Sequence, residues 1–201
     1  MKQTRHLLIA LALGTMLTSC GASVSTATVT GPAAYVDPYI GSGGHGHVFV
    51  GASVPFGAIQ AGPQNIHKGW DWCSGYHHSD SIVIGFAHTH LSGTGCTDMG
   101  DVQIMPYTGE LRSKRGRQED IGGSCSSYYS HDNESVSPGY YSLKMDNGVR
   151  IEMTASTRTA LHRITYPEAE GRRLLINLEE GNGDGAYDTY LRQTDAHTVE
   201  G

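Results

Sequence analysis

One β-hairpin signal in the second half of the chain constrains the fold more than any other feature. Residues 139–145 form a β-prone run that leads into Asp146-Asn147-Gly148, where Asn and Gly tolerate the positive φ of a tight turn. Residues 149–154 (VRIEMT) then alternate apolar and polar side chains. This period of two is typical of a strand with one buried face. The segment therefore predicts two antiparallel strands.

Further short runs extend this pattern along the chain. Residues 161–166 end at Pro167, residues 173–178 lead into a glycine-rich turn, and residues 82–86 are also β-prone. No stretch after the N-terminal segment shows a convincing amphipathic helix or an internal repeat. Short strands with frequent turn signals predict an all-β fold, an antiparallel β-sandwich.

Glycine is concentrated in the middle of the chain. The 27 glycines among 201 residues are about 13%, nearly twice the usual ~7%. Residues 36–106 interleave them with histidine and aromatic residues. Because a strand scaffold that carries such loops is where binding residues gather, we expect the functional surface here.

The N-terminus has the features of an export signal. Lys2 and Arg5 precede the apolar run 7–17, which is too short to span a bilayer but suits a signal peptide. Residues 17–20 (LTSC) resemble a bacterial lipobox, with an ordinary signal peptide as the alternative. We therefore expect residues 1–19 to be cleaved and Cys20 to be lipidated. Residues 20–35 would form a flexible tether and residues 36–201 the β-sandwich domain, anchored on the periplasmic or cell-surface side of an outer membrane.

Three cysteines remain after Cys20, at positions 73, 96 and 125. An exported compartment permits a disulfide, but three thiols allow at most one pair. No C-x-x-C zinc pattern is present. The pairing among Cys73, Cys96 and Cys125 stays open.

The charge balance excludes one class of partner. The chain has 14 Lys+Arg against 20 Asp+Glu, a net charge of −6, without the basic stripe of a nucleic-acid binder. The basic residues of segment 110–132 are too few to change this and predict a solvated loop. They are Arg112, Lys114, Arg115 and Arg117. We expect no nucleic-acid partner.

Three clusters could carry chemistry. Residues 41–47 (GSGGHGH) lack both the G-x-x-x-x-G-K-[ST] pattern and a following helix, which argues against a phosphate loop. Residues 69–78 (GWDWCSGYHH) place tryptophans beside Asp, Ser and His, a combination that can bind a sugar or simply pack in a core. Residues 86–98 form the third cluster.

The third cluster also permits a metal site. His88 and His90 are two residues apart, so on a strand they face the same way and could chelate an ion near Asp98 and Asp101. The alternative is a pair of histidines that bond backbone carbonyls and hold a glycine turn in shape. A wider version is a metal protein centred on four histidines, namely His45, His47, His88 and His90.

The blocks of this region occur in a recognisable order. They are residues 36–41 (VDPYIG), 43–47 (GGHGH), 55–57 (PFG), 69–71 (GWD), 74–77 (SGYH) and 85–95 (GFAHTHLSGTG). Together they resemble the N-terminal domain of glycoside hydrolase family 92, the calcium-dependent exo-acting α-mannosidases. The resemblance covers residues ~36–201 and is far more specific than one short motif.

The resemblance implies a β-sandwich packed against a larger C-terminal (α/α)₆ barrel. The implied reaction is hydrolysis of terminal α-mannose from N-glycans or mannan with inversion, which uses one acid and one base. It implies Ca²⁺ bound to mannose O2 and O3, with the acid, the base and most calcium ligands in the barrel. No catalytic or metal-ligating residue is thus expected in this chain, and Glu179, Glu180 and Asp184 are not chosen as an acid/base pair.

Residue by residue, the resemblance places Trp70 in an aromatic wall around the leaving-group sugar. The linkage preference stays open, because the selecting residues come partly from the barrel, although Trp70 favours α-1,2 linkages. The other substrate-binding candidates lie in matching blocks and would bond sugar hydroxyls or brace the loops that carry Trp70. They are Asp71, Tyr76, His77, His88 and His90.

The chain ends before any barrel, so we expect a fragment or a truncated gene product that is inactive alone. Its expected partners are α-mannoside glycans, its own C-terminal domain and a membrane through the lipid anchor. Without the barrel, the apolar docking surface would be exposed. The alternative is a non-catalytic, glycan-binding surface lipoprotein.

Overall fold

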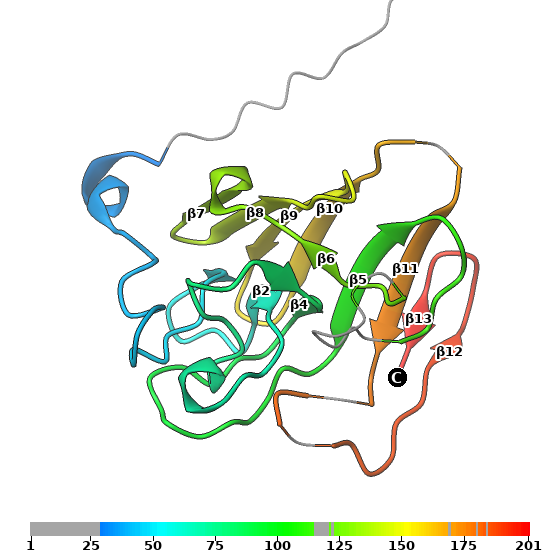
Figure 1. Ribbon diagram of the computed structural model, residues 1–201, viewed down its shortest axis with the longest axis horizontal. Coiled ribbons are helices and arrows are strands. Elements are labelled where there is room, and N and C mark those ends of the chain that lie inside the picture. The colour runs from blue at the N-terminus through cyan, green and yellow to red at the C-terminus, as the bar shows by residue number, and fades with distance from the viewer. Residues whose placement is uncertain (1–28, 115–120, 122, 169, 180, 184) are drawn as a thin grey trace, which may run out of the picture.

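The computed structural model describes residues 29–114, 121, 123–168, 170–179, 181–183 and 185–201. Within them the chain folds into antiparallel sheets with no α-helix, and the two larger sheets pack as a sandwich (Figure 1). The predicted signal peptide, Cys20 and the tether as far as residue 28 lie outside the described residues. In the described part of the chain, no helix is long and apolar enough to cross a membrane.

The first layer is a five-stranded sheet in the order β1-β2-β4-β5-β11. Its strands are β1 (Ala52–Ser53), β2 (Gln60–Gln64), β4 (Gly85–Ala87), β5 (Gln103–Thr108) and β11 (Arg172–Asn177). Strands β5 and β11 pair over six residues, from Arg172 opposite Thr108 to Asn177 opposite Gln103. The predicted run 173–178 is β11, shifted by one residue.

The second layer is a four-stranded sheet in the order β10-β9-β8-β7. Its strands are β7 (Glu134–Ser137), β8 (Tyr140–Lys144), β9 (Arg150–Ala155) and β10 (Ala160–Thr165). The predicted hairpin joins β8 to β9: Gly148 has φ 85° and its N–H donates to the Met145 carbonyl at 2.9 Å. The Asn147 side chain accepts the Val149 N–H, which explains why this turn carries Asn and Gly.

The core lies between the two sheets and confirms the predicted alternation. Ile151 and Met153 on β9 are buried, whereas Arg150 on the opposite face is exposed. Strands β1 and β2 pack against β9, and the Phe86 and Tyr141 rings meet across the layers with their centroids 6.4 Å apart. The predicted antiparallel β-sandwich is therefore confirmed.

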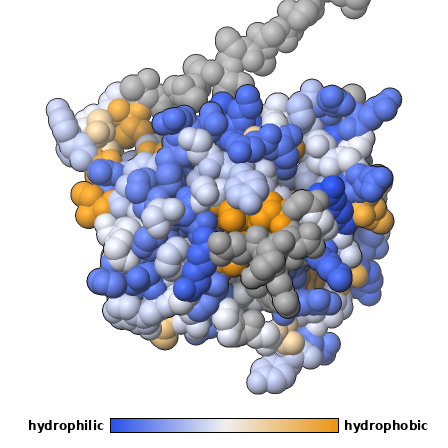
Figure 2. Space-filling view, viewed as in Figure 1, coloured by the Kyte–Doolittle hydropathy of each residue, from blue (hydrophilic) through white to orange (hydrophobic). Residues whose placement is uncertain are grey.

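Smaller elements complete the fold. They are the strand pairs β3 (Ile82–Val83) with β6 (Ser127–Tyr128) and β12 (Arg192–Gln193) with β13 (Val199–Glu200), and the 3₁₀ turns η1 (Gly31–Tyr35), η2 (Trp70–Trp72) and η4 (His131–Asn133). The predicted β run 82–86 is split at Ile84, whose N–H donates to the Gln64 carbonyl, so β3 and β4 join different sheets. Figure 2 shows that the face in view is mainly hydrophilic, with separate apolar areas.

Candidate functional site

The fold brings the three glycine-rich sequence clusters together at one place. The Gly93 N–H donates to the His47 carbonyl at 2.7 Å, and the Trp70 indole N–H donates to the Gly95 carbonyl at 2.8 Å. The His47 ring meets the Trp70 ring edge to face, with centroids 4.1 Å apart. We call His45, His47, Trp70, Asp71 and Gly95 the Trp70 cluster. Sequence analysis named these three blocks but not their contact.

Trp70 is exposed and yet held in place. Trp70 is the first residue of η2, and 58% of it is accessible to solvent. The bond to Gly95 and the contact with His47 restrain the indole from two sides. A Cβ on Gly95 would lie 2.8 Å from the indole nitrogen, so a larger residue there would push the indole out of this position. An exposed, pre-oriented aromatic ring is suited to binding a ligand with an apolar face.

Asp71 adds an anionic acceptor beside this ring. The His45 Nδ1 lies 2.6 Å from Asp71 Oδ1, and the His47 Nε2 lies 3.7 Å from the same oxygen. The hydrogen bond from His45 lowers the pKa of Asp71, with the nearby histidines adding to the effect. Asp71 is therefore a carboxylate at neutral pH. His45, whose side chain is 78% exposed, forms the open edge of the cluster.

The glycine-rich loop that carries His45 and His47 closes tightly on itself. The Val48 N–H donates to the Gly41 carbonyl at 3.1 Å, and the Gly46 N–H donates to the Gly43 carbonyl at 3.2 Å. His47 has φ 56°, a left-handed value that costs free energy in a non-glycine residue. Such strain persists only where the surroundings hold it, which agrees with a loop built to present side chains.

Replacing Gly46 with alanine tests this packing. The new Cβ would lie 2.0 Å from the Gly41 carbonyl oxygen, so the loop must open. We expect the free energy of unfolding to fall by about 1–3 kcal/mol in urea denaturation. Gly43→Ala in the same loop is the control, because its Cβ would meet only His78 Cβ at 3.6 Å. Equal stability of the two variants would contradict the close approach of Gly46 to the Gly41 carbonyl.

Three predicted site residues lie below the surface. Tyr76, His77 and His90 are buried. His77 Nε2 lies 3.1 Å from the Gly44 carbonyl, its Nδ1 bonds Ser79, and its ring stacks on Trp72. Buried side chains of this kind suit the alternative in which these residues brace the loops that carry Trp70, rather than direct contact with a ligand at the surface.

His88 and His90 take separate partners. Strand β4 ends at Ala87, and both histidines follow it. The His88 Nδ1 donates to the Val102 carbonyl and its Nε2 lies 2.9 Å from His162 Nε2 on β10. The His90 Nδ1 donates to the Gln60 carbonyl, and its ring stacks on Phe49. The backbone-bonded alternative therefore describes this pair better than a shared ion does.

The alternative of a metal protein centred on four histidines has no counterpart in the described part of the chain. There, the only group of three or more His, Cys, Asp or Glu residues with converging ligand atoms is His78, His131 and Glu134. It offers two imidazoles and one carboxylate, whereas Ca²⁺ takes six to eight oxygen ligands. These residues do not fit calcium, and we derive no step through that ion.

Glu134 is a further candidate residue that no sequence motif indicates. Its side chain is fully buried and receives hydrogen bonds from Tyr141 at 2.7 Å, from Tyr76 at 3.0 Å and from His131 Nδ1 at 2.7 Å. Burial, and after it the Glu134 charge, raises the pKa of the Tyr76 and Tyr141 hydroxyls, so both stay protonated donors. No local motif signals this network, because its members come from three separate segments.

The three described cysteines are free thiols. Cys73 and Cys125 are buried and Cys96 is exposed. The Cys73 thiol donates to the Thr94 carbonyl, and the Cys125 thiol donates to the Arg112 carbonyl. No disulfide joins any two of them in the structure.

Comparison with known proteins gives a consistent result. The glycosyl hydrolase family 92 N-terminal domain matches residues 35–201. An uncharacterized secreted glycosidase from Arthroderma benhamiae is 32% identical over 158 residues, which are 74% of this chain and 18% of that protein.

Two solved structures from Bacteroides thetaiotaomicron are also similar. The family GH92 α-mannosidase BT3965, in complex with mannoimidazole, has 41% identity and a TM-score of 0.70 over 73% of this chain and 20% of that one. The family GH92 inverting mannosidase BT2199 has 29% identity and a TM-score of 0.60 over 72% of this chain and 19% of that one. The chain thus spans about a fifth of the length of these relatives.

Proposed function

The chain belongs to glycosyl hydrolase family 92, whose N-terminal domain it matches, and on that premise we propose that it forms one wall of a mannoside-binding site in an α-mannosidase. The observation that carries this proposal is the restrained, exposed Trp70 with Asp71 at its side. An indole face packs against the C–H face of a pyranose. Asp71 and His45 would bond the hydroxyls at the edge of the same sugar.

The proposed reaction is hydrolysis of terminal α-mannose with inversion, from N-glycans or mannan. The relatives support it, since one is an α-mannosidase bound to mannoimidazole and another an inverting mannosidase. An inverting enzyme uses two carboxyls about 6.5–9.5 Å apart. We assign these carboxyls, and the calcium ligands, to the C-terminal part of the longer enzyme. The secreted relative supports export of this chain, and anchoring through Cys20 remains part of the proposal.

The C-terminal segment offers a surface for the rest of such an enzyme. From residue 185 to residue 201 every described residue is exposed. Exposed apolar side chains there include Tyr187, Tyr190, Leu191 and Val199. Uncovered apolar groups in one segment are typical of a surface that another domain covers.

Trp70→Ala tests the binding wall. We expect the affinity for α-1,2-mannobiose to fall about 30-fold, or ~2 kcal/mol, since the variant removes the aromatic face and leaves the fold intact. The affinity is measured by NMR titration of the purified chain. Tyr128→Ala is the matched control, because Tyr128 is an exposed aromatic residue outside the Trp70 cluster. An unchanged affinity in Trp70→Ala would refute the proposed contact.

A second test asks whether this chain hydrolyses a mannoside by itself or only as part of a longer enzyme. We expect the purified 201-residue chain to release no mannose from α-1,2-mannobiose, with or without added Ca²⁺, because the proposal places the acid and base outside it. Calcium-dependent release of mannose would contradict this assignment. Binding without hydrolysis fits both the enzyme part and the non-catalytic glycan-binding lipoprotein. The coding sequence after Gly201 distinguishes these two, because an in-frame barrel supports the enzyme and a stop codon the binding protein.

A further inference from the structure

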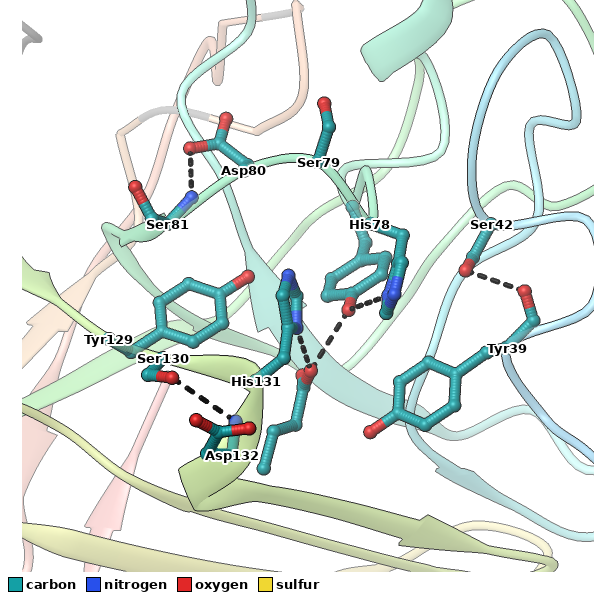
Figure 3. Close-up of polar contacts among 12 residues, drawn as sticks. Tyr39, Ser42, His78, Ser79, Asp80, Ser81, Tyr129, Ser130, His131 and Asp132 are labelled. Carbon is teal, nitrogen blue, oxygen red and sulfur yellow. Dashed lines mark hydrogen bonds and ion pairs between the residues drawn. The ribbon is translucent and has the colours of Figure 1, made fainter.

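His78, His131 and Glu134 form a compact group outside the Trp70 cluster. His78 lies in the loop after η2, His131 begins η4 and Glu134 begins β7. Each residue offers one ligand atom, and these three atoms all lie within 4.8 Å of one another. Figure 3 shows the His78 and His131 side chains next to each other, and their rings stack with centroids 4.2 Å apart.

The surroundings of Glu134 resemble the outer shell of a metal site. Tyr141 donates to one carboxylate oxygen and Tyr76 to the other, so both oxygens have fixed directions. Hydrogen bonds of this kind orient metal-ligating carboxylates. Tyr76 also lies 3.4 Å from His78 Nδ1, which connects the phenol to a second member of the group.

The group also has an opening to solvent. His78 is exposed and the His131 side chain is about one-third exposed, so an ion can enter from solvent.

We propose that His78, His131 and Glu134 bind one Zn²⁺ ion, with a water molecule in the remaining position. Two imidazoles and a carboxylate are a ligand set that Zn²⁺ prefers and that Ca²⁺ does not. Ligands must lose their protons to bind a metal. The ion would therefore bind His131 Nδ1 in place of the proton that this atom donates to Glu134, and that proton would move to Nε2, so that the imidazole stays neutral.

Such an ion would stabilise the glycine-rich loop through the contact of His78 with Ser42. The His78 N–H donates to the Ser42 carbonyl at 2.8 Å, and Ser42 in turn donates its hydroxyl to Tyr39. The ion would thus join η4 and β7 to the loop that carries His45 and His47. No ligand belongs to the Trp70 cluster, so this inference does not depend on the proposed function.

Metal binding to the purified, chelator-treated chain tests the inference. Isothermal titration with ZnCl₂ should give one high-affinity ion per chain, and CoCl₂ should give the visible absorption of four-coordinate Co²⁺. His78→Ala should weaken Zn²⁺ binding at least ~10-fold, because losing a ligand costs no less than losing an outer-shell partner, which costs about 10–100-fold. His78 is exposed, so this variant should fold, which circular dichroism checks.

His67→Ala is the matched control, because His67 is also an exposed histidine but lies outside both this group and the Trp70 cluster. It should bind Zn²⁺ as the wild type does. Absence of a high-affinity Zn²⁺ site in the wild type, or an unchanged site in His78→Ala, would overturn the inference. Displacement of Zn²⁺ by millimolar CaCl₂ would overturn it as well.

Discussion

Glu134→Ala is expected to lower the free energy of unfolding by about 3–5 kcal/mol, as for the loss of one partner from a buried ionic network. Glu134 accepts hydrogen bonds from Tyr76, Tyr141 and His131, and its side chain has no access to solvent. The alanine variant leaves two phenol hydroxyls and an imidazole N–H without their acceptor. Urea denaturation at neutral pH with a chelator present measures this loss apart from any metal effect.

Two further variants make this prediction specific. Glu134→Gln keeps one acceptor oxygen and should lose less stability than Glu134→Ala. Glu152→Ala is a control on the same sheet, since Glu152 accepts one phenol hydrogen bond, from Tyr140, and its side chain is not fully buried. It should cost about 1 kcal/mol. A loss in Glu134→Ala no larger than that in Glu152→Ala would show that the network does not stabilise the fold.

Acidification is expected to destabilise the protein through His90. Burial lowers the pKa of His90 to about 4, whereas an unfolded histidine has a pKa of about 6.5. The unfolded chain therefore binds this proton first as the pH falls. Stability is fully present above pH ~6.5 and decreases by about 2 kcal/mol by pH 5 and about 3 kcal/mol by pH 4. Burial also lowers the pKa of His162 to about 4, which acts in the same direction.

The His90→Asn variant isolates this contribution. Asparagine retains a donor for the Gln60 carbonyl, which His90 Nδ1 bonds at 2.8 Å, but it does not titrate. Urea denaturation between pH 7 and pH 5 should show that the stability of the variant decreases less steeply with falling pH. The difference in slope should correspond to about one proton fewer taken up on unfolding. An identical pH dependence in wild type and variant would mean that His90 is not kept neutral in the folded state.

The sheet layers were predictable because their signals are local. Asp146-Asn147-Gly148 marks a turn by its own backbone preferences, and the alternation in residues 149–154 marks a buried face. Both agree with the structure. The run 82–86 was predicted less well, since its split depends on Gln64, a residue of another strand. Pairing partners of this kind are not encoded in a short segment.

The candidate site was predictable only in part. Trp70 and Asp71 stood out as residue types, and the structure places Trp70 at the surface with the partly buried Asp71 next to it. Their contacts with His45, His47 and Gly95 arise from loops that meet only after folding. Glu134 carried no signal at all, because a lone carboxylate in a polar segment is usually solvated. Its role depends on phenols from distant segments that enclose it.

We have proposed that Trp70 faces a bound mannoside. The chain has two tryptophans, so the indole N–H resonances of Trp70 and Trp72 can be followed separately by NMR. Trp72 is the internal control, because its indole bonds Asp80 and its ring stacks on His77. On titration with α-1,2-mannobiose, we expect a saturable shift of the Trp70 resonance and little change at Trp72. A Trp70 resonance that does not move while the sugar binds elsewhere, or no binding at millimolar sugar, would contradict it.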